Sequence, residues 1–147
     1  MNMERMPSIS LMSRLWPFLL VLCVLAFVTF PTLEGIVTRW VKWDESYSHG
    51  LLLAGVSLYL IWRKAKINPV APGFAPVWVL PLIACLLAYW VGGLIRLQAL
   101  QQLALVPLLF AACATLMGWR QARWFIVPLG LLFLTIPVWD FLAWTLQ

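Results

Sequence analysis

The residue types best suited to proton transfer in this chain are concentrated in one short stretch. It reads Trp43-Asp44-Glu45-Ser46-Tyr47-Ser48-His49-Gly50 and contains the single histidine of the protein. Histidine exchanges protons near neutral pH, and hydroxyl or carboxylate neighbours can orient it. The same stretch also suits a simpler role. Ser46 or Ser48 can cap a helix N-terminus, and the acidic pair lies favourably at its positive end. Residue types alone favour the helix start over catalysis.

A second polar group consists of three glutamines. Gln98, Gln101 and Gln102 are spaced at i, i+3 and i+4, so on a helix they share one face. Arg96 lies just before them, which places the polar patch at one end of an apolar segment. Polar faces in membranes hold helices together or line a path for a substrate, and both interpretations remain open.

The three cysteines do not form a recognisable reactive site. Cys23, Cys85 and Cys113 each lie inside an apolar run, and no Cys-x-x-Cys or Cys/His metal spacing occurs. The run Ala112-Cys113-Ala114-Thr115 suggests a nucleophile, but no base lies nearby in the sequence. We therefore interpret the thiols as structural, and expect no catalytic residue among them, no metal site and no cofactor.

These residues must be positioned by elements that rest in lipid. Of the 147 residues, 64% are hydrophobic and only 10% are charged, whereas a soluble domain is about a quarter charged. The ten Lys and Arg residues form short clusters between apolar runs, which is typical of membrane topology and argues against nucleic-acid binding. The composition predicts an all-α, polytopic transmembrane helix bundle without a soluble domain.

A spanning helix needs about 20 mostly apolar residues. Four segments satisfy this length without a Lys, Arg or Glu in their interior: Leu15–Leu33, Val77–Ile95, Leu97–Gly118 and Trp124–Ala143. A fifth, Gly50–Trp62, is long enough only if its helix begins near Ser46. We expect Arg63, Lys64 and Lys66 to end that helix at the headgroups.

Charge placement gives the orientation. Five spans with a cytoplasmic N-terminus place seven basic residues inside and three outside, as the positive-inside rule requires. Four spans with an exterior N-terminus score equally, and we prefer five because of the capping signals and the family resemblance that follows. The exterior, substrate-facing candidates are then Trp43, Tyr47, His49, Arg96, Gln98 and Asp140. Arg96 and Asp140 lie at a similar depth, and we hypothesise that they pair.

Two blocks of the sequence resemble the exosortase family. The first contains Trp43, then Tyr47-Ser48-His49-Gly50-Leu51 and Tyr59-Leu60-Ile61-Trp62-Arg63. The second contains Gly118-Trp119-Arg120, Arg123, Pro128-Leu129, Leu132, Ile136-Pro137-Val138-Trp139-Asp140 and Leu146-Gln147. The resemblance runs from about Trp40 to the last residue, and its first block is the more specific.

The resemblance implies a multi-pass protein of the bacterial inner membrane. Exosortases are regarded as cysteine proteases or transpeptidases that process the C-terminal PEP-CTERM sorting signals of exported proteins and accompany exopolysaccharide production. The implied partners are the lipid bilayer and sorting-signal peptides. The implied chemistry is thiolate attack on a peptide carbonyl, with an arginine stabilising the oxyanion.

The sequence departs from the family pattern at the catalytic region. No Ala-Cys-Ser-Gly motif is present, and His49 matches the N-terminal motif rather than the catalytic histidine. We therefore expect residues 1–147 to be a single transmembrane domain, the N-terminal part of a longer exosortase domain, and inactive alone. The alternative is a non-enzymatic membrane module, such as a transporter or assembly subunit or a scaffold, which uses the glutamine face to bind partner helices.

Overall fold

The computed structural model describes residues 11–41, 48–68, 71 and 73–136, with the backbone alone at 11–15 and 48. Within these ranges the chain forms helices and no strand. The long helices are α1 (Leu11–Val41), α2 (Ser48–Ile67), α3 (Val79–Leu94), α4 (Gln98–Met117) and α6 (Ile126–Leu134). The short ones are η1 (Pro76–Trp78), α5 (Trp119–Ala122) and η2 (Arg123–Phe125).

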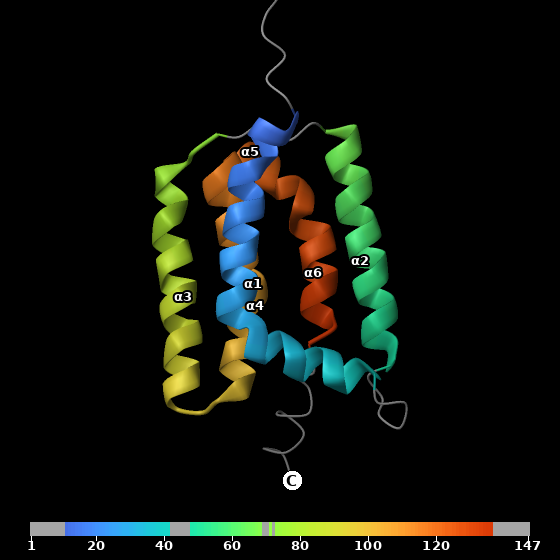
Figure 1. Ribbon diagram of the computed structural model, residues 1–147, viewed down its shortest axis with the longest axis vertical. Helices are drawn as coiled ribbons and strands as arrows, with labels where there is room; N and C mark the ends of the chain where they lie inside the picture. Colours follow the sequence, from blue (N-terminus) through green and yellow to red (C-terminus); the bar gives the residue numbers. More distant parts are fainter. Residues whose placement is uncertain (1–10, 42–47, 69–70, 72, 137–147) are drawn as a thin grey trace, which may run out of the picture.

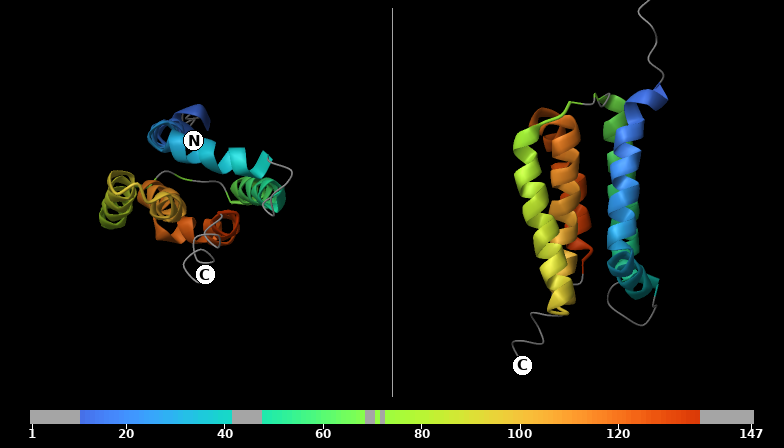
Figure 2. Two further views of the ribbon diagram at one scale, coloured as in Figure 1. Left: turned by 90° about the horizontal axis from the view of Figure 1, so that it is seen from below. Right: turned by 60° about the vertical axis from the view of Figure 1, so that its left-hand side comes forward.

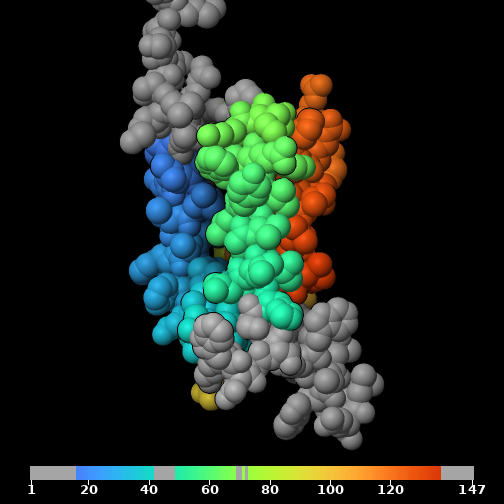
Figure 3. Space-filling model, turned by 90° about the vertical axis from the view of Figure 1, so that its right-hand side faces the viewer, coloured from blue at the N-terminus to red at the C-terminus, as the bar shows by residue number. Residues whose placement is uncertain are grey.

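The five long helices run side by side and alternate in direction along the chain (Figure 1). Seen from the side in Figure 2, α1 and α2 form one layer, and α3, α4 and α6 form the other. The space-filling view in Figure 3 shows α2 flanked by α1 and α6. This arrangement confirms the predicted all-α bundle, and it is the up-and-down order that five spans require.

The outer surface of the bundle is apolar. Large side chains such as Phe27, Leu80 and Trp90 are 84%, 74% and 64% exposed, which in water would be costly and in lipid is not. Three helical stretches of the described chain are long and apolar enough to cross a membrane: Trp16–Val41, Pro76–Leu94 and Gln98–Met117. In the most apolar part of Gln98–Met117, 56% of the residues are buried, whereas the corresponding share for Pro76–Leu94 is 11%. Helix α4 is therefore the central helix of the bundle.

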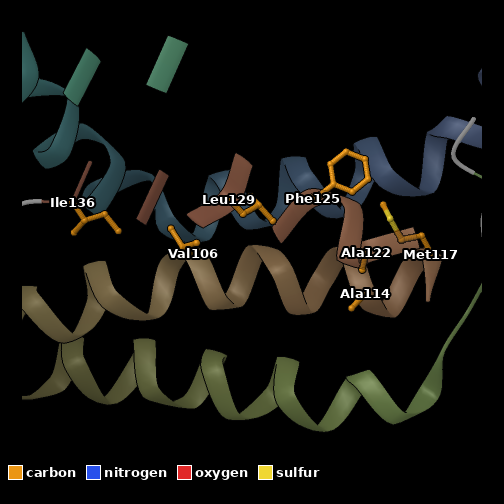
Figure 4. Packing of buried hydrophobic residues seen from close by; sticks show 7 residues of the cluster. All are labelled: Val106, Ala114, Met117, Ala122, Phe125, Leu129 and Ile136. Atoms are coloured by element: carbon orange, nitrogen blue, oxygen red, sulfur yellow. The ribbon is translucent and has the colours of Figure 1, made fainter. Parts of the chain in front are cut away.

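The core lies where α4 meets the chain that returns after it. Val106, Ala114 and Met117 of α4 pack against Ala122, Phe125, Leu129 and Ile136 (Figure 4). Ala114 and Ala122 are fully buried. Small residues at such contacts allow helix backbones to approach closely, which is the usual basis of helix packing in membranes.

Three helix boundaries differ from those predicted. Helix α1 continues eight residues past Leu33 and bends, so that its last turns lie across one end of the bundle (Figure 1). The bend follows Pro31, which lacks an N–H and clashes with the preceding turn. Helix α2 includes the basic cluster and ends at Ile67, since cations are favourable in a last turn. Helix α6 ends at Leu134, near a proline that disfavours helical backbone before it; the remainder of the predicted segment to Ala143 lies outside the described residues.

The connection from α3 to α4 is a tight turn. The N–H of Leu97 donates to the carbonyl of Gly92 at 2.8 Å, and the N–H of Arg96 donates to that of Gly93 at 3.2 Å. This pair of bonds is the Schellman motif, which satisfies free carbonyls at a helix end. Arg96 takes the left-handed position with φ 55°, where glycine is the usual residue.

The linker between α2 and α3 is anchored to α4 by backbone hydrogen bonds. The N–H groups of Gly73 and Ala75 donate to the carbonyls of Leu116 and Thr115, both at 2.9 Å. Carbonyls in the last turn of a helix have no partner within it, so this linker satisfies two of them.

Candidate functional site

The two ends of the bundle carry different side chains. One end, here called the basic end, contains Arg63, Lys64 and Lys66 of α2 together with Arg120 and Arg123. The opposite end, here called the polar end, contains Arg39, His49, Arg96 and Gln98. The chain alternates direction, so candidates that are distant in the sequence collect at the polar end (Figure 1).

Three of the six predicted site residues are described. His49 is the second residue of α2 and is exposed, Arg96 is exposed in the α3–α4 turn, and Gln98 is the exposed first residue of α4. Trp43, Tyr47 and Asp140 lie outside the described residues, so the Arg96–Asp140 pair stays a prediction. Arg96 and Gln98 are close in the chain, while His49 lies at the same end on a different helix.

A polar cavity of about 230 Å³ lies between α1 and α4 at the polar end. Its walls are formed by Pro31, Thr32, Gly35 and Arg39 of α1 and by Gln98, Gln101 and Gln102 of α4. The structure therefore gathers the three glutamines on one face, as their spacing predicts. The cation beside them is Arg39, and Arg96 does not line the cavity. Local sequence spacing does not identify this partner, because Arg39 lies on another helix.

The polar side chains of the cavity are packed in place but form no hydrogen bonds with other described side chains. Gln102 is 7% exposed, whereas Gln98 is exposed and Gln101 and Arg39 are half-buried. Gln101 lies over the glycine pair of α3, since a Cβ at Gly93 would lie 3.0 Å from its Nε2. Among the described residues, none of these four side chains forms a hydrogen bond or an ion pair with another side chain. Their donors and acceptors remain available to a ligand.

A buried hydroxyl pair supports one wall of this cavity. Thr32 Oγ1 and the Tyr89 hydroxyl of α3 lie 2.8 Å apart, and both residues are less than 10% exposed. Buried polar groups in lipid must be paired, so this bond fixes the bent part of α1 relative to α3.

A second contact joins three helices at the polar end. The indole N–H of Trp40 donates to the carbonyl of Thr135, just after α6, at 3.3 Å. The same indole lies against Gly50 near the start of α2, where a Cβ would be only 2.6 Å from Trp40 Cδ1. The absence of a side chain at Gly50 leaves room for the Trp40 indole. Gly50 therefore has a structural role in a motif whose residue types first suggested chemistry.

An apolar cavity of about 150 Å³ lies between α1, α4 and the end of α6. It is lined by Leu33, Ile36, Val37 and Trp40 of α1, by Leu105, Val106 and Leu109 of α4, and by Leu129, Leu132, Thr135 and Ile136. The α4 residues of the two cavities follow one another on one helix face. That face therefore changes from polar to apolar within two turns.

The three thiols lie on three different helices and are all free. Cys23 of α1 is exposed, Cys85 of α3 is half-buried, and Cys113 of α4 packs against the apolar core. Within the described part of the chain, no group of three His, Cys, Asp or Glu residues is placed to hold a metal ion.

Comparison with known proteins gives one match. A family model described as transmembrane exosortase matches residues 40–147. No curated protein and no solved structure matches the chain. The matched range begins at Trp40, the residue that joins α1, α2 and the end of α6.

Proposed function

Because this chain belongs to the transmembrane exosortase family, we propose that it provides the membrane-embedded scaffold of an exosortase-type cysteine protease or transpeptidase. The substrates are the C-terminal sorting signals of exported proteins, and the setting is the bacterial inner membrane and exopolysaccharide production. The polar end is the side from which the substrate approaches.

The packing of α2 against α6 is the observation that carries this proposal. These helices hold the two sequence blocks that resemble the family, and Ser57 Oγ of α2 donates to the carbonyl of Pro128 at 2.6 Å. Ser57 is fully buried. Together with the Trp40–Thr135 bond, this contact joins the described parts of the two blocks into one packed unit.

The charge distribution supports the orientation. Basic residues flanking spans are retained in the cytoplasm, so the basic end with its five cations belongs inside. The polar end, with His49 and the glutamine-lined cavity, then faces the exterior. An exported protein with a C-terminal anchor presents its cleavage region on that side.

The cysteines support inactivity of this chain alone. Thiolate attack on a peptide carbonyl needs a thiol beside a base, accessible to the substrate. Cys23, Cys85 and Cys113 are instead distributed over α1, α3 and α4, and Cys113 packs in the core. We propose that the polar end binds and guides the sorting signal, and that none of these three thiols is the nucleophile.

Photocrosslinking from the two ends of α2 tests this proposal. A benzophenone amino acid is placed at His49 or, as the matched control, at Lys66, which is exposed at the opposite end of the same helix. A reporter with a C-terminal sorting signal is co-expressed, and a reporter without the signal is the second control. We expect capture from position 49 alone and only with the signal. Equal capture from both positions contradicts substrate approach at the polar end, and cleavage of the reporter by this chain alone refutes its inactivity.

A further inference from the structure

We propose that the polar cavity between α1 and α4 binds the phosphodiester group of a phospholipid from the leaflet at the polar end. This site is independent of the peptidase chemistry. It rests on the charge of the cavity, on the amides that line it, and on its position in the bundle next to an apolar cavity.

The charge of the cavity matches a phosphodiester. Arg39 is the only charged residue among its seven lining residues, and the other polar groups are neutral amides and one hydroxyl. A guanidinium with flanking N–H donors forms charge-assisted hydrogen bonds to phosphate oxygens. One cation balances the single negative charge of a phosphodiester. The cavity is also lined by the first turns of α4, a 20-residue helix whose N-terminal dipole favours an anion.

The amide of Gln102 supplies hydrogen-bonding groups to the cavity. This side chain is 7% exposed, lines the cavity, and forms no hydrogen bond to another described residue. Among the described residues no side-chain N or O atom is both fully buried and unpaired, so this amide reaches the open space of the cavity and is available to a ligand. A phosphate oxygen accepts from the Gln102 amide and from Arg39 at once.

The position of the cavity favours a lipid over a free anion. Gln98 and Gln102 lie in the first turns of one candidate span, and Arg39 lies near the end of another. This is the depth of the headgroups, where every phospholipid carries a phosphodiester. Leu109 follows Gln102 by seven residues, about 10 Å along α4, and lines the apolar cavity. A polar site with an apolar cavity along the same two helices matches a phosphate with the start of its acyl chain.

Lipid retention by the purified 147-residue chain tests the proposal. The chain in non-ionic detergent is incubated with phosphatidylglycerol, diacylglycerol or oleate, and bound lipid is counted by native mass spectrometry. We expect retention of phosphatidylglycerol and little of the other two. Arg39→Gln and Gln102→Leu each weaken retention about tenfold, the usual effect of removing a hydrogen bond to a charged group. Arg96→Gln, an exposed cation at the same end that does not line the cavity, leaves retention unchanged.

The remaining outcomes are decisive. Gln102→Leu replaces a cavity-facing amide, which forms no hydrogen bond within the described residues, with an apolar side chain of similar size, and circular dichroism checks that the variant keeps its helices. Its loss of retention then reports the site and not misfolding. Equal retention of diacylglycerol, or full retention by both cavity variants, overturns the proposal. Equal retention of oleate assigns the cavity to carboxylates, and displacement by millimolar inorganic phosphate assigns it to a free anion; either result also overturns the proposal.

Discussion

Replacing Gly50 with alanine is the sharpest test of the contact that joins α1, α2 and α6. The new Cβ would lie 2.6 Å from Trp40 Cδ1 and 3.1 Å from Cε2, whereas carbon atoms normally approach to about 3.5–4.0 Å. The indole must therefore move by about 1 Å. Its hydrogen bond to Thr135 is already 3.3 Å long and does not survive that displacement.

The expected loss of stability is about 2 kcal/mol. Overpacking costs about 1–3 kcal/mol and the lost hydrogen bond about 1 kcal/mol, while alanine regains up to about 1 kcal/mol of helix propensity. The measurement is the free energy of unfolding in mixed detergent micelles, followed by circular dichroism. Gly55→Ala is the matched control in the same helix, because a Cβ there meets nothing within 4 Å.

For the control substitution we expect a change in stability of the opposite sign. Gly55→Ala is expected to raise stability by about 0.5–1 kcal/mol, since Gly55 is exposed inside a helix. In a Trp40→Leu background the clash is absent, so Gly50→Ala should then behave like Gly55→Ala. Equal effects of the two alanine substitutions in the unchanged chain would refute the packing of Trp40 on Gly50.

Four further substitutions have defined outcomes in the same unfolding assay. Arg96→Gly is expected to stabilise the chain by about 1 kcal/mol, because φ 55° is strained for arginine and free for glycine; a loss of stability contradicts the turn. Thr32→Val and Tyr89→Phe each cost about 1 kcal/mol by leaving one buried hydroxyl unpaired, and the double variant costs less than their sum; strict additivity excludes the pair. Ser57→Ala is expected to lower the free energy of unfolding by about 0.6–1.7 kcal/mol, because the hydrogen bond to the Pro128 carbonyl is lost. An unchanged free energy of unfolding would show that this bond does not stabilise the α2–α6 contact.

The sequence predicts the helices well because lipid imposes strong local rules. Val77–Ile95 and Leu97–Gly118 agree with the observed helices to within two residues at each end. Every backbone group in lipid must be paired, so apolar runs of this length are helical regardless of their contacts. The turn at Arg96 was also predictable, since the glycine pair and a following basic residue end a span.

The contacts between helices were not predictable from local patterns. The glutamine face followed from its spacing, but its partner Arg39 is 59 residues from Gln98 and reaches it only because α1 bends after Pro31. Arg96 is nearer in the sequence but does not line this cavity. The role of Gly50 likewise depends on Trp40, which lies across a segment outside the described residues.

Cysteine labelling at the two ends of α2 is the most direct test of how the bundle sits in the membrane. His49→Cys and Lys66→Cys, both exposed positions, are introduced into a chain whose three native cysteines are alanine, and intact cells are treated with a membrane-impermeant maleimide. If α2 crosses the bilayer with the polar end outside, position 49 reacts in intact cells and position 66 reacts only after the membrane is opened. Reaction of both positions from the same side contradicts the five-span arrangement and, with it, the exterior placement of the polar cavity.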